Sequence, residues 1–284
     1  MKYPRSLPEP GKCIYIFDEA HHLSFKSNNH FSSHTRIKSS LSWLEHCEKF
    51  LLLLAKEGIL HSEQQALLQN IVNSIRDYSE TVWIQLEQTI ESSEELDKHE
   101  SKYQYTFELG VLPEEIKDVS TNLSIEYTRL VNNLKDISDE LRKILDQDVE
   151  TKKVTLVEQM YPILGINTER AESNLQLWSS YARKDPIGSV PTARWLTFIE
   201  NEVNADVSLF SSPVLAAENL KERLWGSCGG AVLTSATLSA LGEFEMLRLR
   251  TGLPEQTNYL SIPSPFDFGG SANFVVPRMN CEPA

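Results

Sequence analysis

Cysteine is scarce in this sequence, and its spacing does not suit a metal site. The four cysteines are Cys13, Cys47, Cys228 and Cys281, and no two of them form a C-x-x-C pair. This spacing excludes the common structural zinc patterns and gives no disulfide framework. Cys13 and Cys228 lie at or near expected strands, where small thiols are often simply buried.

Long apolar runs are also missing. Runs such as residues 50–55 are far too short to span a bilayer, and no charged-then-apolar leader opens the chain. We therefore expect a cytoplasmic protein. The glycine-rich string G-x-x-x-x-G-K-[ST] is absent as well, so the sequence supplies no phosphate-binding loop of that kind.

Basic residues are outnumbered by acidic ones. The 284 residues include 40 Asp and Glu but only 27 Lys and Arg, which gives a net charge of −13. This balance excludes a protein whose entire surface binds nucleic acid, although it allows a local basic groove.

The stretch that organises the chain lies near its start. Residues 13–17 form an apolar, β-prone run that leads directly into Asp18-Glu19-Ala20-His21. Such a run predicts a strand buried on both faces of a parallel sheet, and ligands bind at the carboxyl ends of such strands. Asp18 can there hold Mg²⁺ through water, and Glu19 can orient or deprotonate an attacking water. The alternative is a buried strand followed by an ordinary polar loop.

A second string of the same kind appears more than two hundred residues later. A glycine turn leads into the apolar run 231–233 and then into Thr234-Ser235-Ala236-Thr237. An ordinary strand with a hydroxyl-rich turn, or a helix N-cap at Thr237 or Ser239, is the alternative. If the two strings act together, residues 14–17 and 231–233 share one parallel sheet, and Asp18 and Ser235 meet at one site.

Helical periodicity dominates the region between the two strings. Apolar residues recur at helical spacing from about residue 34 to 183, and 116–144 predicts one long amphipathic helix. Residues 24–33 are polar and predict a loop, 103–109 a short strand or extended crossing, and Pro162 and Gly165 a helix break. Residues 26–190 contain 18 Lys and Arg against 27 Asp and Glu, so this block carries most of the acidity.

Two strands and two short helices are expected after this block. The alternation in 194–200 and 207–210 predicts strands. Ser212 is the expected N-cap of a helix with Pro213 at its first position, running over 214–225. A second short helix is expected over 242–250, closed by Gly252.

Together the two strings resemble motifs II and III of superfamily 2 helicases. With Arg250-Thr251-Gly252-Leu253 and Ser264-Pro265-Phe266-Asp267, the chain resembles the DinG branch of the XPD-like, DEAH-box DNA helicases. The resemblance implies an α/β fold: a partial RecA-like P-loop motor domain, built on a parallel sheet, with a large α-helical Arch-like insertion. The implied parts are 1–25 (first part of motor domain 1), 26–190 (Arch-like insertion), 191–263 (remainder of motor domain 1) and 264–284 (a stub leading to motor domain 2).

The resemblance also implies a function and residue roles. It implies an ATP-dependent 5′-to-3′ helicase that translocates on single-stranded DNA in DNA repair or replication. Asp18 would hold Mg²⁺ through water, Glu19 would activate the hydrolytic water, and His21 would link the nucleotide site to motif III. Ser235 and Thr237 would couple hydrolysis to the bound strand. The family's 4Fe–4S cluster is held by cysteines ahead of motif II, so we assign none of its ligands to this chain.

The departures from the family pattern leave alternatives open. Without a phosphate-binding loop or the arginine motif of a second motor domain, we expect an internal fragment that is inactive alone. One alternative is a helical module that binds a protein partner or DNA and has no activity of its own. Another is a different P-loop ATPase that shares only the two acids. DNA contacts in the acidic block would need local positives such as Lys152-Lys153 or Arg183-Lys184.

Overall fold

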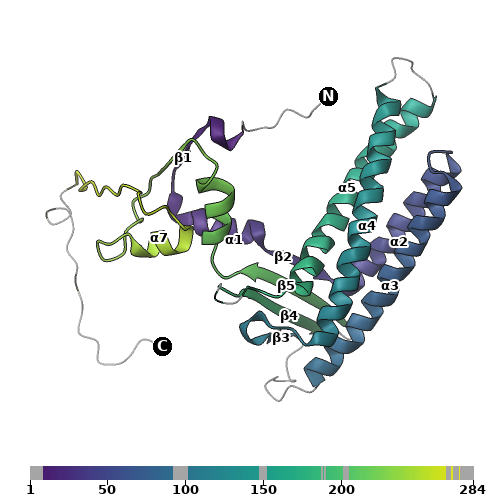
Figure 1. Cartoon of the computed structure of the whole chain (residues 1–284), viewed down its shortest axis with the longest axis horizontal. Helices are drawn as coiled ribbons and strands as arrows, with labels where there is room; N and C mark the ends of the chain where they lie inside the picture. The colour runs from purple at the N-terminus through teal and green to yellow at the C-terminus, as the bar shows by residue number, and fades with distance from the viewer. Residues whose placement is uncertain are drawn as a thin grey trace.

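The chain forms two connected parts, an α/β lobe and a helical unit (Figure 1). The computed structural model describes residues 9–91, 102–146, 152–186, 190–200 and 205–266, together with 188, 270 and 275. The α/β lobe consists of residues 9–32 and 214–266, and the helical unit of residues 33–213. The acidic run 92–100 and most of the C-terminal stub lie outside the described residues.

The α/β lobe is built around a pair of parallel strands. Strand β1 (Ile14–Phe17) pairs with β6 (Gly230–Leu233), so that Ile14 lies opposite Gly230 and Phe17 opposite Leu233. The predicted parallel sheet is therefore confirmed, although its two strands are more than two hundred residues apart in the sequence. The two segments are both short apolar runs, the type of sequence that forms strands in parallel sheets.

The prediction that these strands are buried on both faces is wrong for the described residues. Ile14 and Ile16 are 71% and 73% exposed, and Val232 is 49% exposed. Two strands alone cover little of each other, and within the described chain the packing on this sheet is one-sided. Trp225, for example, packs edge-on against Phe17 with ring centroids 6.2 Å apart.

Four long helices make up most of the helical unit. They are α2 (Ile37–Lys56), α3 (Ser62–Glu91), α4 (Glu114–Leu145) and α5 (Lys152–Ala182). Figure 1 shows them side by side as a long bundle. The predicted amphipathic helix is α4, which follows Pro113 and carries Glu114 and Glu115 in its first turn, where acidic side chains favour the helix dipole.

A four-stranded antiparallel sheet closes one end of this bundle. Its order is β2 (Ser33–Arg36), β5 (Ala205–Pro213), β4 (Thr192–Glu200) and β3 (Lys102–Thr106). One face packs on the helices, because Leu196, Val207 and Leu209 belong to the same buried core as the helix side chains. The segment 191–263 thus divides: β4 and β5 pair with strands of the helical unit, and only the part after β5 returns to the parallel sheet.

A buried arginine joins the sheet to the end of the bundle. Arg194 of β4 forms a two-pronged ion pair with Asp185, at 3.1 and 3.2 Å. The same guanidinium donates to the carbonyl oxygen of Ser180, at the end of α5, and to that of Gly110, in the turn η3 (Glu108–Gly110). Because Arg194 is only 2% exposed, its charge depends on these partners.

Two local predictions are wrong. Residues predicted as a loop form the helix α1 (Leu23–Phe31), none of whose residues is fully buried. The predicted break at Pro162 and Gly165 is absent, because α5 runs continuously through both residues. Val157, Met160 and Leu164 are buried in the core on either side of Pro162, and this packing offsets the backbone hydrogen bond that proline cannot make.

The segment after β4 also differs in detail. Ser212 is not a helix N-cap, since β5 continues through Pro213 and pairs it with Thr192. The helix that follows is short: α6 (Ala217–Leu220) passes into a π-helical turn, η4 (Lys221–Trp225). The last helix, α7 (Glu245–Thr251), ends at Gly252 in the left-handed conformation, as predicted. Within the described residues, no helix combines the length and apolar character needed to cross a membrane.

Candidate functional site

The two sequence motifs meet at the carboxyl ends of β1 and β6. The Thr234 amide donates to the carbonyl oxygen of Phe17, and the Ala20 amide donates to that of Thr234, both at 2.9 Å. These two backbone bonds extend the parallel pairing past the ends of the strands. They hold the Asp18-Glu19 turn directly against the hydroxyl residues of the second motif, so Asp18 and Ser235 lie on the same edge.

Asp18 is fixed by its neighbours through one carboxylate oxygen. The Thr234 hydroxyl and the Glu19 amide both donate to Asp18 Oδ1, each at 3.0 Å. These bonds orient the side chain and leave Oδ2 for another ligand. Magnesium binds through one or two carboxylates and keeps several waters and substrate phosphates as its other ligands, so Asp18 suits this ion.

Glu19 has an unusual backbone conformation. Its φ and ψ are 49° and 43°, in the left-handed region that a residue with a β-carbon rarely adopts. Glu19 holds this conformation between the fixed Asp18 side chain and the backbone bond from Ala20 to β6. Such strained positions persist where the surroundings determine them and are concentrated at functional sites. The Glu19 side chain is 63% exposed, so water can reach its carboxylate.

Ser235 is the centre of the hydrogen-bond network between the motifs. Its hydroxyl donates to Glu19 Oε2 at 3.2 Å and lies 2.8 Å from His21 Nδ1. Since the hydroxyl has one proton, a bond to Glu19 requires that His21 Nδ1–H be the donor toward Ser235. His21 Nδ1 is also 3.1 Å from Glu19 Oε2, so the ring can donate to both partners.

Thr237 contacts the site indirectly, through Ser235. Its amide donates to Ser235 Oγ at 3.3 Å, and its hydroxyl lies 3.5 Å from the same atom. Thr237 thus contacts the DEAH turn through Ser235. Thr234, by contrast, bonds Asp18 directly but was not among the predicted site residues. The signal for it was present, because Thr234 is the first hydroxyl after the strand and therefore comes closest to the end of β1.

The basic residues considered for DNA contacts, and the cysteines considered for a metal, lie outside this network. Arg183 and Lys184 are both exposed; Lys184 pairs with Glu114 at 3.0 Å, and hydrogen bonding to Glu114 raises the pKa of Lys184. The side chains of Lys152 and Lys153 are outside what the structure describes. Burial raises the pKa of the Cys47 thiol to about 12, which disfavours the thiolate that metal binding needs. Within the described ranges, no group of three or more His, Cys, Asp or Glu is arranged to hold a metal.

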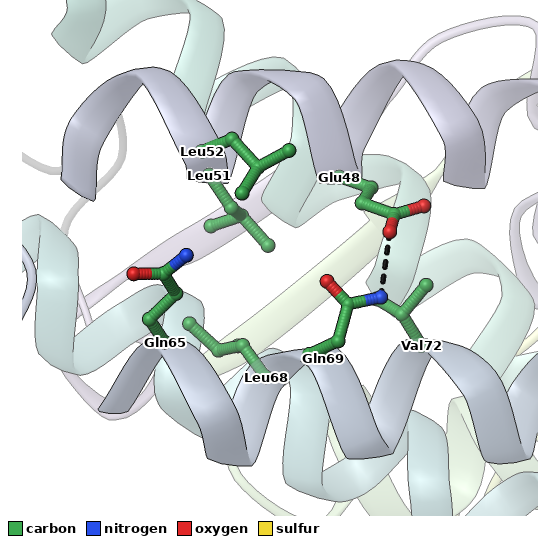
Figure 2. A pocket seen from close by; sticks show the side chains of 7 residues that line it. All are labelled: Glu48, Leu51, Leu52, Gln65, Leu68, Gln69 and Val72. Carbon is green, nitrogen blue, oxygen red and sulfur yellow. Dashed lines mark hydrogen bonds between the residues drawn. The ribbon is translucent and has the colours of Figure 1, made fainter. Parts of the chain in front are cut away.

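A hollow on the helical unit lies away from the motifs (Figure 2). It is formed between α2 and α3, with Leu51, Leu52 and Leu68 among the residues that line it. Its one charged group is already paired, because Glu48 accepts from Gln69 at 2.6 Å and from Arg76 at 3.1 Å. The hollow is therefore a feature of helix packing rather than a second candidate site.

The fold and the site together define a class of protein. Parallel strands that end in Asp-Glu-Ala-His and Ser-Ala-Thr, interrupted by a helical insertion, are consistent with a partial RecA-like domain that carries a helical insertion. No family model matches the sequence.

The curated proteins to which the chain is similar share one name, ATP-dependent DNA helicase DinG. A protein of Photobacterium profundum named ATP-dependent DNA helicase DinG is 28% identical over 284 residues, covering 98% of this chain and 39% of that protein. The proteins of the same name from Escherichia coli and Salmonella typhimurium are 26% and 23% identical, over 64% and 98% of the chain. The chain covers 25% and 38% of these two proteins. These similarities support its recognition as a DinG-type helicase segment.

Proposed function

We propose that this chain is the part of an ATP-dependent DNA helicase that carries the hydrolytic acids and their link to the DNA-binding machinery. The observation that carries the proposal is the hydrogen-bonded junction of the two motifs. Across one parallel strand pair, Thr234 bonds Asp18 and Ser235 bonds Glu19. The relatives' name supplies the substrate classes, ATP and DNA. The alternative of an inactive helical interaction module is not favoured.

The proposed roles follow from the contacts. Asp18 holds Mg²⁺ through water, which in phosphoryl transfer neutralises the charge that develops on the phosphates. Glu19 is exposed and held toward the same edge, where it orients and deprotonates the attacking water. His21 and Ser235 share the Glu19 carboxylate, so the position of motif III reports on the position of the base. Thr237 extends this link through Ser235.

We further propose that the motor part and the Arch-like insertion are divided at the boundary between the two sheets. The sequence suggested an insertion over 26–190 flanked by motor segments 1–25 and 191–263, with a stub from 264. The pairing of β4 and β5 with β2 supports an insertion that extends to residue 213. A 5′-to-3′ polarity, a role in DNA repair or replication, and a 4Fe–4S cluster held by residues outside this chain complete the proposal for the longer protein.

The direct test compares this chain with a longer protein that adds a phosphate-binding loop and a second motor domain. We expect the purified 284-residue chain to hydrolyse no ATP, with or without single-stranded DNA, because its sequence lacks the G-x-x-x-x-G-K-[ST] string. Two acids alone present only negative charge to the nucleotide. We expect DNA-stimulated phosphate release from the longer protein. Turnover by the chain alone that Glu19→Gln abolishes would show that it holds a complete site.

Coupling between hydrolysis and strand movement depends on the Ser235–Thr237 contact. In the longer protein, we expect Thr237→Ala to leave ATP turnover within a few-fold of wild type and to lower unwinding by about five- to tenfold. Loss of a hydrogen bond of this kind costs about 1–3 kcal/mol when its partner stays buried, and the exposed site places the effect at the lower end. Phosphate release and strand displacement are measured on the same preparation. Equal loss of both activities would assign Thr237 a catalytic or folding role instead.

A further inference from the structure

The segment that follows the DEAH turn has a charge opposite to that of the whole chain. Residues 20–44 contain no Asp or Glu, three Lys or Arg, and four of the seven histidines, in a protein of net charge −13. They form the turn η2 (Ala20–His22), α1, β2 and the start of α2. The segment that follows the motif II site therefore carries no acidic residue of its own.

One face of α1 is exposed along its whole length. His22, Phe25, Lys26, Asn29 and His30 are all exposed and follow one another at intervals of three and one, so they share a face of the helix. Phe25 is 61% exposed, an unusual position for an aromatic ring beside a lysine. An exposed ring next to a cation is the arrangement on which proteins stack nucleic-acid bases while pairing with the phosphates.

The chain passes from α1 directly into β2 of the four-stranded sheet, where a column of stacked rings begins. His34 of β2 stacks on Phe210 of β5, and Phe210 stacks on Trp195 of β4, with ring centroids 6.0 and 5.2 Å apart. These rings lie on the sheet face opposite the helices, because Leu196 and Leu209, their neighbours along the strands, are in the core. The exposed ring of His34 ends this column, so a base stacked there adds one more layer.

We propose that this surface binds single-stranded DNA. The surface, here named the α1 stripe, consists of His22, Phe25, Lys26, Asn29, His30 and His34, with Phe210 and Trp195 behind His34. The inference rests on the proposed function, since the DNA helicase assignment selects DNA as the polyanion. Lys26 pairs with phosphates, while Phe25 and His34 stack on bases. Nearby Arg36 is half exposed but already paired with Asp206 at 3.3 Å, so it adds less.

The position of the stripe connects DNA to hydrolysis. His22 begins the stripe, and its ring lies 3.8 Å from that of His21. His21 in turn contacts Glu19 and Ser235. Movement of single-stranded DNA along α1 therefore displaces His22 and, through it, His21, which contacts the proposed general base Glu19. This coupling of DNA movement to hydrolysis does not involve Thr237.

Binding is measured by fluorescence anisotropy of a labelled oligo-dT on the 284-residue chain, without nucleotide. We expect Lys26→Glu to weaken binding about tenfold at 0.1 M salt and to reduce the salt slope by about one phosphate contact or more. Phe25→Ala is expected to weaken binding by about five- to a hundredfold. Lys143→Glu and Ile166→Ala, at exposed positions on α4 and α5, are matched controls that should leave binding unchanged. Circular dichroism verifies that all four variants fold.

A second measurement maps the contact itself. An oligonucleotide carrying 5-iododeoxyuridine should crosslink to peptides that contain Phe25, His34 or Trp195 on irradiation. Absence of binding, equal losses in the control variants, crosslinks confined to other peptides, or tighter binding of oligo-U than oligo-dT would each overturn the proposal. Because no ATP is present, these results are independent of the ATPase tests, so failure of the stripe and failure of the proposed function are distinguishable.

Discussion

Replacing Glu19 with Gln in the longer protein is expected to lower ATP turnover by about 10²–10⁴-fold while ATP still binds. The amide keeps the size of the side chain but cannot accept the proton of the attacking water. Asp18 is held by Thr234 and the backbone, so the proposed metal ligand stays in place. Nucleotide binding is measured by anisotropy of a fluorescent ATP analogue, and turnover by phosphate release under saturating DNA.

The matched control for this change is Glu218→Gln on α6. It makes the same chemical substitution at a residue that belongs to neither motif. Its turnover should equal that of the wild type. Near-normal turnover in Glu19→Gln would mean that another group is the base, and the DEAH assignment of this residue would have to be abandoned.

Arg194→Ala is expected to lower the free energy of unfolding by about 3–5 kcal/mol. The substitution leaves the Asp185 carboxylate without its main partner and removes the donors to the carbonyl oxygens of Ser180 and Gly110. Arg194→Lys should recover part of the loss, because it keeps the charge but not the planar fork. Urea unfolding followed by circular dichroism measures both variants. Arg248→Ala removes an exposed pair with Glu245 and should change stability little.

The same ion pair gives a pH dependence. Burial raises the pKa of Asp185, but hydrogen bonds from Arg194 and Thr192 outweigh it and hold the pKa below its ordinary value. A carboxyl with a lower pKa in the folded state stabilises the fold above its unfolded pKa, about 3.9. The stabilisation is lost as pH falls through the folded value. The stability difference between wild type and Asp185→Asn should thus persist near neutrality and narrow only below about pH 4.

The sequence predicted best where one local pattern decided the structure. The runs that form β1 and β6 are short and apolar and show no helical periodicity, so strands were predicted. Their pairing was predicted because the motif residues that follow them had to lie at one site. The helix α4 follows from apolar residues at intervals of three and four. The junction of Asp18 and Ser235 was predicted from the same reasoning, and the structure places both residues on one edge.

Prediction was poorer where contacts between residues far apart in the sequence determine the local structure. The polar, Ser- and Asn-rich composition of α1 resembles a loop, yet the helix forms between the DEAH turn and β2 with no buried residue of its own. Pro162 is tolerated because its neighbours in α5 are buried in the core and α5 packs along α4. The partners of β5 could not be read locally, since β2 lies about 170 residues earlier and its run Ser33–Arg36 has no clear strand pattern.

The entry and exit of the helical unit lie side by side. The chain enters through β2 and leaves through β5, with Ser33 opposite Ser211 and the hydroxyls of Ser32 and Ser212 joined at 2.8 Å. Antiparallel neighbours are separated by only ~5 Å between Cα atoms. A tight turn from residue 32 to residue 212 could therefore replace the whole unit without changing the path of the chain through the parallel sheet. The closeness of these two ends predicts that protein design can shorten, exchange or remove the unit with little change to the pairing of β1 and β6.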